Sequence, residues 1–364
     1  MLAILAAAKP PILTPYYSII LWVFIIEAIL VILLGSMGIG MQWYLRKQRE
    51  RNQSKRTHFK QLLMQYTEKN ETALGKSFLS SFRGEIPWLL SAISDVNQSI
   101  DPEKVGSAWE KVRQNIGENI LLPKGRKLAF RRRWTQQLTA VRCFAMYPKV
   151  EDETPILHLL KQKVPIIKFT AAHAAARLGT PKAFEALLEA MNQATHYLRQ
   201  PYIDALRKSG DKAYQYLEHK LETETNPLVR VSCLEVLSDR MNEHIARLLE
   251  PDLKSPHKNL KIAAARALGH YPDFSSTEAL LPLLSDPAWE VKAISARSLG
   301  YIKASRAVKE LAATCQDPTW WVRMNAALAL KRIGSVGIEK LEALRPETDR
   351  FAYEIAQYVL ALPE

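Results

Sequence analysis

The sequence predicts an all-α protein in which an α-solenoid of stacked helical hairpins follows one N-terminal transmembrane helix. Two observations lead to this fold class: a pattern that recurs every 31 residues from Ile167 onward, and an apolar run at residues 19–34. A repeat of this length is typical of stacked supersecondary units, because one helical hairpin cannot bury its apolar face alone. The apolar run and its flanks are long enough to cross a bilayer.

The first expected element is the transmembrane helix at residues 18–42, which follows a short tail at 1–17. Residues 19–34 read IILWVFIIEAILVILL, and the apolar character continues to about residue 41. Thirteen Ile, Leu, Val and Phe side chains contribute about −0.5 kcal/mol each to insertion, which outweighs a cost on the order of 3 kcal/mol for Glu27. Aromatic residues at the two ends fit the interfacial belts of membrane proteins: Tyr16, Tyr17, Trp43 and Tyr44.

The distribution of charge predicts the orientation of this helix. Only Lys9 is charged before the run, whereas basic residues crowd the segment after it: Arg46, Lys47, Arg49, Arg51, Lys55, Arg56 and Lys60. Because basic flanks stay in the cytoplasm, we expect a single-pass inner-membrane protein with its N-terminus outside and its C-terminal repeats in the cytoplasm. A cleaved signal peptide is the alternative, but the chain lacks a basic segment before the run and a convincing small-residue cleavage site after it.

The basic excess of the chain is concentrated near the membrane. Residues 46–137 carry 19 Lys and Arg against 9 Asp and Glu, whereas residues 138–364 carry 30 against 27. Part of this excess lies in the connector at 43–100, which we expect to be helical. Its basic residues should lie against anionic lipid, where each gains about 1 kcal/mol. For this reason the net charge of +13 does not indicate nucleic acid as a partner.

A second basic cluster lies further along the chain, in the segment KGRKLAFRRRW. Its members are Lys124, Arg126, Lys127, Arg131, Arg132 and Arg133. Two interpretations stay open, because charge runs report partners only loosely. The cluster is either a surface that faces solvent or lipid, or a binding site for an acidic protein, an anionic polymer or a nucleotide.

Residues 101–364 are expected to form the solenoid, with the clearest pattern at 150–340. In one unit Val291, Ile294 and Leu299 fall on one face of an α-helix. The residue after the apolar start is basic in six successive units: Lys168, Arg199, Arg230, Lys261, Lys292 and Arg323.

Proline and glycine predict where these helices begin and end. An Asp, Asn or Ser followed by Pro predicts an N-cap with proline at the first helical position. Such pairs are Asn226-Pro227, Ser255-Pro256, Asp286-Pro287 and Asp317-Pro318. Glycines at one repeat phase predict helix ends, and they are Gly179, Gly210 and Gly334.

Two segments resemble HEAT repeats of the short bacterial kind, the group that includes the phycobilisome-lyase-like repeats. They read DPAWEVKAISARSLGYI from Asp286 and DPTWWVRMNAALALKRIG from Asp317. The resemblance covers about residues 150–340, and it implies that an Asp or Asn in the turn bonds to the basic residue of an adjacent repeat. We therefore expect the six basic residues to form a structural ladder. An anion-binding strip on one face of the solenoid is the alternative.

Tryptophan and cysteine residues of the repeats have separate expected roles. Trp289 and Trp320 share one repeat phase and are expected to be packing residues. Trp321 is a candidate exposed anchor for a partner, since aromatic residues are enriched at binding hot spots. The three cysteines have no metal-binding or redox spacing. Cys233 occupies a small helix-face position, as a packing residue in a reducing compartment would.

Glu27 lies inside the transmembrane run, where an ionisable side chain indicates function. Ser36 and Gly40 nearby have the small-xxx-small spacing of closely packed membrane helices. These three residues predict a contact with another transmembrane segment, either a copy of this one or part of a membrane partner. The alternative is a protonated glutamate that a strongly apolar span tolerates.

The chain contains no HExxH, GxSxG, P-loop or CxxC motif. None of its eight histidines is followed by glutamate, in contrast to the His-Glu pairs of HEAT-like iron hydroxylases. We therefore expect no metal and no other cofactor.

The sequence predicts a membrane-anchored, cytoplasm-facing scaffold that mediates protein–protein interaction. The expected partner is a membrane-bound enzyme or its regulator. Anchored HEAT proteins of this layout resemble accessory subunits of bacterial envelope systems, including exopolysaccharide synthesis. The alternative function is that of a lyase- or hydroxylase-like HEAT enzyme that acts on a protein or a chromophore.

Overall fold

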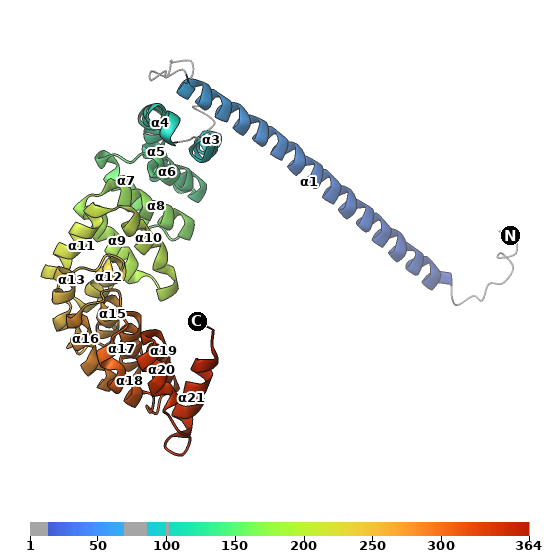
Figure 1. Ribbon diagram of the computed structural model, residues 1–364. Coiled ribbons are helices and arrows are strands. Elements are labelled where there is room, and N and C mark those ends of the chain that lie inside the picture. Colours follow the sequence, from blue (N-terminus) through green and yellow to red (C-terminus); the bar gives the residue numbers. More distant parts are fainter. Residues whose placement is uncertain (1–13, 69–85, 100–101, 364) are drawn as a thin grey trace. The chain divides into compact units, whose positions relative to one another are not determined.

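The structure, a computed structural model, describes residues 14–68, 86–99 and 102–363 (Figure 1). Every regular element in these ranges is helical, which confirms the predicted all-α class. The chain divides into two compact units, Met1–Ile120 and Leu121–Glu364. Most of the predicted N-terminal tail lies outside the described residues.

The first unit is built on the long helix α1, Thr14–Glu68, which continues from the apolar run directly into the basic segment. Within the part of the chain that the structure describes, α1 is the one helix long and apolar enough to cross a membrane. The apolar side chains that are described lie on its surface, and Trp43 and Tyr44 are exposed at the end of the run. Tyr16 and Tyr17, the other half of the predicted aromatic belt, have side chains outside the described residues.

The C-terminal end of α1 packs against α3, Ile86–Ser99, and α4, Pro102–Ile116. Leu63 is fully buried in this contact. Beside it, the guanidinium of Arg56 donates hydrogen bonds to both carboxylate oxygens of Asp95. Because a bidentate pair holds the two side chains in one geometry, it fixes α1 in register with α3.

The second unit is a stack of eight helical hairpins, which follow one another along the chain from green to red in Figure 1. The first helices are α5 (Leu122–Ala129), α7 (Glu153–Leu160), α9 (Pro181–Gln193), α11 (Asp211–Thr223), the pair α13 (Glu243–Leu248) and α14 (Glu250–Leu253), the pair α16 (Phe274–Leu280) and η4 (Leu281–Ser285), α18 (Val308–Thr314) and α20 (Ser335–Glu342). The second helices are α6 (Trp134–Met146), α8 (Pro165–Leu178), α10 (Gln200–Lys208), α12 (Pro227–Leu237), α15 (Lys258–Leu268), α17 (Trp289–Tyr301), α19 (Trp320–Ile333) and α21 (Arg350–Ala361). The remaining short elements are η1 (Gly117–Leu121), η2 (Val150–Asp152), η3 (His196–Leu198) and η5 (Ser305–Ala307).

Small residues at one repeat phase form the centre of the stack. Five of the six residues at this phase are small and fully buried, and the sixth is the buried Tyr202: the small ones are Ala171, Cys233, Ala264, Ser295 and Ala326. Their size lets successive second helices approach closely, so α12 packs on α15, α15 on α17 and α17 on α19. The prediction that Cys233 is a packing residue is confirmed.

The glycines predicted to end helices have backbone angles that other residues rarely adopt. The φ angle is +68° at Gly179, +72° at Gly210 and +103° at Gly334. A side chain would strain the backbone at these angles, so glycine ends the helix at low cost.

The predicted N-cap is found at Asn226 but not at Asp286. The Asn226 side chain accepts the N–H of Leu228 at 3.0 Å, at the start of α12. Asp286 instead accepts the N–H of Ala288 at 2.9 Å in a turn that precedes α17, and the turn before α19 has the same form. The prolines after these two aspartates therefore lie in a turn and not in the first position of a helix.

One apolar start position of the repeat is exposed, and another, Val229, is only partly buried. Leu198 is 47% exposed, whereas Ile167 and Val291 are fully buried. The cause is Pro201, which lies in the first turn of α10, where a residue without an N–H is tolerated. Since α10 begins only at Gln200, Leu198 precedes the helix and does not face its core.

Candidate functional site

The basic residues of the repeat join each second helix to the hairpin that follows. The ammonium group of Lys261 donates a hydrogen bond to the carboxylate of Asp286, and Lys292 donates in the same way to Asp317. Each carboxylate also accepts the N–H two residues further on, so one Asp fixes both its own turn and the hairpin before it. The two lysine side chains are only 15% and 18% exposed.

Arg230 occupies the same repeat position and has more acceptors. Its Nε and Nη2 donate to the two carboxylate oxygens of the buried Asp252 at 2.7 and 2.8 Å. Its Nη1 and Nη2 also donate to carbonyl oxygens of the chain: Leu221, Glu224 and Leu248. These carbonyls lie at the ends of α11 and α13, where no helical N–H is left to bind them. The guanidinium therefore caps two first helices at once.

The other positions of this series differ. Arg199 lies 2.9 Å from the carboxylate of Glu235. Arg323 is buried and donates to two carbonyl oxygens of its own turn, with the Phe351 ring beside it. Lys168 is partly buried and forms no ion pair within the described part of the chain. Five of the six cations are thus engaged inside the stack, where an external anion does not reach them.

The fold separates the members of the second basic cluster. Arg126 on α5 donates to the fully buried carboxylate of Asp152 at 2.6 Å, which is the same kind of link as the Lys–Asp pairs of later hairpins. Lys124 is partly buried and Lys127 is exposed on the same helix. Arg126 therefore has a structural partner already.

The exposed part of the cluster is the turn between α5 and α6. Three consecutive arginines are exposed there: Arg131, Arg132 and Arg133. Exposed aromatic side chains flank them, Phe130 on one side and Trp134 on the other. This turn, and not the whole cluster, is the surface on which a lipid headgroup or an acidic group would meet free guanidinium groups.

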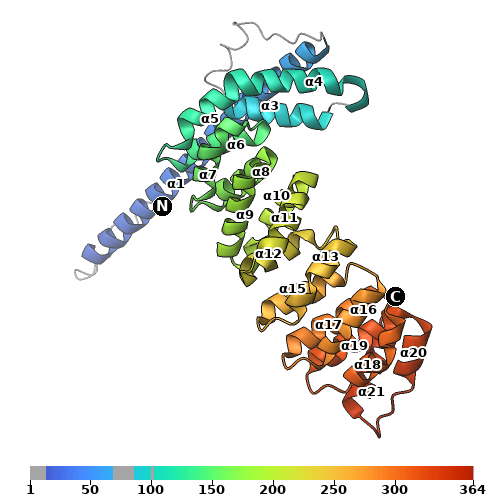
Figure 2. The same ribbon diagram turned by 90° about the vertical axis from the view of Figure 1, so that its left-hand side faces the viewer.

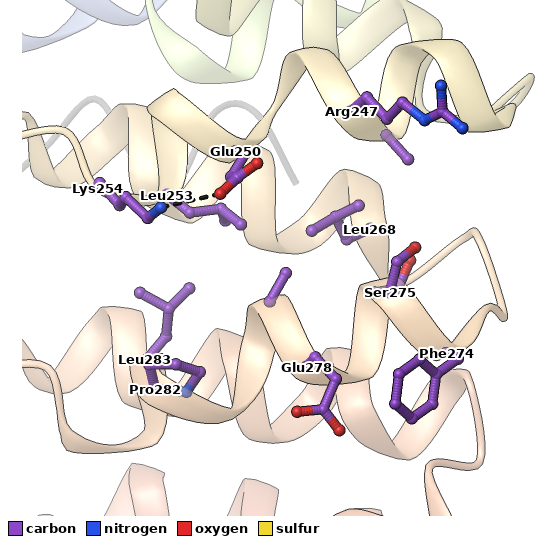
Figure 3. A pocket seen from close by; sticks show the side chains of 13 residues that line it. Arg247, Glu250, Leu253, Lys254, Leu268, Phe274, Ser275, Glu278, Pro282 and Leu283 are labelled. Atoms are coloured by element: carbon purple, nitrogen blue, oxygen red, sulfur yellow. Dashed lines mark hydrogen bonds and ion pairs between the residues drawn. The ribbon is translucent and has the colours of Figure 1, made fainter.

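A groove opens between the first helices of the fifth and sixth hairpins (Figure 3). Its volume is about 530 Å³, within the range of about 300–1,000 Å³ that ligand pockets occupy. The pair α13 and α14 forms one wall, the pair α16 and η4 forms the other, and Leu268 of α15 lies at the base. Leu253 and Leu283 point into the groove from opposite walls.

Two prolines at one repeat phase explain why the groove lies here. Pro251 and Pro282 are 31 residues apart, and each interrupts the first helix of its hairpin. Proline removes a helical N–H and clashes with the preceding turn, so both first helices break at the same height. The segments α13 and α16 contain 6 and 7 residues, and beyond the break the first helix continues as α14 in one hairpin and as η4 in the other.

The groove has charged edges and one unsatisfied hydroxyl. Arg247 and Lys254 lie along one wall, and Glu278 lies on the other. Ser276 is buried in the lining, and its Oγ has no hydrogen-bond partner among the described residues. An unpaired buried hydroxyl costs about 1–3 kcal/mol, so Ser276 lowers the stability of the wall that carries it. An apolar pocket with a few polar groups is the composition of a recognition site.

A second exposed aromatic surface lies near the C-terminal end of the stack. The rings of Trp320 and Trp321 meet edge to face with centres 4.6 Å apart, and Trp320 lines a pocket of about 260 Å³ with Phe351 and Tyr358. Trp321 is 57% exposed, as an anchor residue requires. Trp320 and Trp289 are 45% and 41% exposed, so the expectation that they are packing residues is wrong. Both are the first residue of a helix, where the side chain projects beyond the packed turns.

The residues predicted to contact another membrane helix lie on the surface of α1. Glu27 and Ser36 are exposed, and the Ser36 hydroxyl donates to the carbonyl of Leu33 at 2.9 Å. No described atom lies within 4 Å of the place where a side chain on Gly40 would start. All three positions are therefore open to another helix, with Ser36 and Gly40 on one face of α1 and Glu27 on the opposite face.

The described residues contain no group of three or more His, Cys, Asp and Glu side chains that could hold a metal ion. Glu222 lies nearest to such a set, since it is 2.8 Å from a ring nitrogen of His244 and 3.3 Å from one of His219. Hydrogen bonds from these two histidines hold the pKa of Glu222 below its usual value.

Comparison with known proteins agrees with this architecture. Residues 277–361 match a sequence family described as HEAT repeats. No curated protein matches the chain in sequence. Among solved structures, Kap121p is similar, with 13% identity and a TM-score of 0.52 over 78% of this chain and 37% of that one. Kap121p bound to Pho4p gives 12% identity and a TM-score of 0.52 with the same coverage.

These similarities establish the fold and nothing more. The chain is a helical solenoid, as predicted, in which residues 277–361 match HEAT repeats, and it spans 37% of the length of Kap121p. The complex of CpcE and CpcF of phycocyanin lyase from Nostoc sp. PCC7120 shows 17% identity over 65% of this chain and 93% of that one. Its TM-score of 0.32 is too low to support an argument about structure or activity.

Proposed function

We propose that the protein is a membrane-anchored scaffold whose HEAT-repeat stack holds a protein partner, with α1 in the membrane and the stack in the cytoplasm. The observation that carries this proposal is the groove between the fifth and sixth hairpins. Its apolar lining and charged edges match the anatomy of protein interfaces, in which an apolar centre is surrounded by a polar rim. Helical solenoids expose extended surfaces that serve such binding.

The membrane part of the proposal rests on the composition of α1. A long helix with exposed apolar side chains is unfavourable in water, and a bilayer removes this cost. The basic residues that follow favour the cytoplasmic side and anionic lipid. A reporter fused after Glu364 should be active on the cytoplasmic side only, and activity on the other side would overturn the orientation.

The partner that we propose is a membrane-bound enzyme or its regulator. An anchored stack meets partners at the membrane more often than partners in solution, because both are held in one plane. This arrangement suits an accessory subunit of a bacterial envelope or exopolysaccharide-synthesis system. The complex of Kap121p with Pho4p supports protein binding as a use of this fold.

Photo-crosslinking in native membranes tests the groove directly. The full-length protein would carry a photoreactive phenylalanine derivative at Phe274, which lines the groove and is 55% exposed. The matched control carries the same group at Val336 on α20, which is 52% exposed and lies outside the groove lining. Mass spectrometry should identify a defined protein crosslinked from position 274 and not from 336.

A groove-filling variant makes this test sharper. Ala279→Trp places a large ring in the groove and should abolish the crosslink from position 274. Its circular dichroism and unfolding midpoint should be recorded in parallel, so that loss of folding is not mistaken for loss of binding. Equal crosslinking from positions 274 and 336, or a crosslink that survives in folded Ala279→Trp, would overturn the proposal.

A further inference from the structure

Two repeat phases, on the second helices or directly after them, bring three arginines together in the last part of the stack. The first phase carries Asp204 and Glu235, followed by Arg266 and Arg297. The second phase carries Lys208 and Asp239, followed by His270, Tyr301 and Arg332. The first phase therefore changes from acidic to basic between α12 and α15, and Arg332 adds a third cation from the second phase.

The two parts differ in pairing as well as in sign. Glu235 and Asp239 are already bound within the stack, at 2.9 Å from Arg199 and 3.3 Å from Arg207. The three later arginines are exposed, and none of them forms an ion pair within the described residues: Arg266, Arg297 and Arg332. Neighbouring cations without a counter-charge repel one another, and a bound anion relieves that repulsion.

Tyr301 links two of these arginines. Its hydroxyl oxygen accepts hydrogen bonds from Nε and Nη2 of Arg297 at 3.2 and 2.9 Å. The guanidinium of Arg332 lies 4.6 Å from the centre of the Tyr301 ring. Because the hydroxyl oxygen is used as an acceptor, its hydrogen remains available to donate. Three guanidinium groups and one hydroxyl therefore offer donors only, and their matching ligand consists of acceptors such as carboxylates.

The spacing of the helices defines the form of that ligand. The helices α15, α17 and α19 pack side by side in this order (Figure 2). Packed helices lie about 8–10 Å apart, and an extended segment of the polyproline II type advances about 3.1 Å per residue with three residues per turn. Every third residue of such a segment faces the same side, so each of these residues would meet the next arginine as the segment crosses the helices.

We propose that the face formed by α15, α17 and α19 binds an extended acidic segment of a partner protein, with a carboxylate at every third residue. Arg266, Arg297 and Arg332 each bind one carboxylate, and the Tyr301 hydroxyl donates to the central one. This inference rests on the proposed scaffold function, since it names the chemistry of a partner. It concerns a surface separate from the groove.

The pairing of charges on the earlier hairpins limits the length of the ligand. Arg199 and Arg207 are already paired with Glu235 and Asp239, so the series of arginines without an acidic partner begins at Arg266. Three helices span about 20 Å, which corresponds to about seven residues of a polyproline II segment. A short acidic segment fits this limit, whereas a nucleic acid or an anionic membrane would extend past it.

Fluorescence anisotropy with the full-length protein in neutral detergent at low salt tests the proposal. The probe is a labelled seven-residue peptide with glutamate at the first, fourth and seventh positions and serine between them. Arg297→Ala should weaken binding at least tenfold, and Arg297→Lys should retain part of it because lysine keeps the charge but not the bidentate geometry. The control Arg350→Ala removes an exposed arginine of α21 that pairs with Glu354, and it should leave the affinity unchanged.

A second peptide tests the spacing. It has the same composition but three adjacent glutamates, and it should bind several-fold more weakly than the spaced peptide. Equal affinities for the two peptides, or for the wild type and Arg297→Ala, would overturn the inference. A crosslink from Phe274 without peptide binding would refute this inference and leave the proposed function standing. Peptide binding without that crosslink would support this inference and refute the proposed function of the groove.

Discussion

Gly300 on α17 lies directly against Ala329 on α19. A methyl group in place of a Gly300 hydrogen would come within 2.6 Å of the Ala329 Cα and 2.7 Å of its Cβ. One repeat earlier Gly269 stands in the same relation to Ser298, where the added carbon would lie 2.7 Å from the Oγ. Since the relation recurs at the repeat period, glycine at this phase sets how closely successive second helices pack.

Gly300→Ala should lower the free energy of unfolding by about 1–3 kcal/mol, because the backbone of α19 has to move to admit the methyl group. Alanine in a helix interior is otherwise about 1 kcal/mol more favourable than glycine, so a loss of stability would report the clash alone. Urea unfolding of the full chain in detergent, followed by circular dichroism, measures this loss of free energy.

The control Lys309→Ala on the exposed side of α18 should change stability by less than about 0.5 kcal/mol. A gain of stability in Gly300→Ala would show that α17 and α19 accommodate the methyl group without a clash.

The ion pair between Lys292 and Asp317 should contribute to the cohesion of neighbouring hairpins. Removing one partner leaves the other partly buried without its counter-charge, since their side chains are 18% and 10% exposed. Lys292→Met or Asp317→Asn alone should each cost about 2 kcal/mol. The double variant should cost less than the two single losses together, which a double-mutant cycle by urea unfolding would reveal. Strict additivity would mean that the two side chains do not stabilise each other.

The same pair should give the stack a defined dependence on acid pH. Burial alone would raise the pKa of Asp317, but the Lys292 ammonium and the N–H of Thr319 more than offset it, so this pKa lies below its usual value. A lowered folded-state pKa means that the contribution is present above about pH 4, the pKa of an unfolded aspartate. It is lost as the pH falls further, through the folded-state pKa. The stability difference between the wild type and Asp317→Asn should therefore shrink below about pH 4 and stay constant between pH 5 and 8.

The repeat period made much of this arrangement predictable. Side chains at one phase lie at equivalent places in successive hairpins, so six basic residues in a row predict a shared structural role. Lys261 and Lys292 indeed bind the aspartates that the HEAT resemblance implies. The same reasoning fails where a proline or a turn shifts the start of a helix relative to the repeat. Pro201 moves one helix start and exposes Leu198, and the turn after Asp286 delays α17 and exposes Trp289.

The groove shows what the sequence alone does not decide. Its signal, Pro251 and Pro282 one period apart, is present in the sequence. Two broken helices leave an open space only when no neighbouring side chain fills it, and that depends on the packing of side chains from three different hairpin segments. Periodicity also does not predict that the buried Ser276 hydroxyl in the wall of the groove remains unpaired.

The three cysteines should be unreactive in the folded protein. Burial raises the pKa of Cys143, Cys233 and Cys315 to about 12 in each case. The thiolate is the reactive form, so almost none is available at pH 8. Titration with a thiol reagent at pH 8 should modify no cysteine in the native protein and three in urea. Rapid modification of one native cysteine would place it in a segment that opens readily.

Glu27→Leu should reduce the recovery of membrane partners from detergent extracts. A glutamate inside an apolar span is stabilised by a hydrogen-bonding group of a neighbouring helix, and leucine cannot supply that bond. Gly40→Ile should also reduce the recovery, because it blocks close approach of a second helix on the face of α1 that carries Ser36 and Gly40. Glu27→Gln should keep part of the recovery, since an amide still forms hydrogen bonds, and Ile32→Leu serves as the control for a neutral change in the same span. Quantitative mass spectrometry at equal protein levels measures the recovery of partners from each variant. Unchanged recovery with Glu27→Leu would mean that the span tolerates this glutamate and that Glu27 contacts no partner.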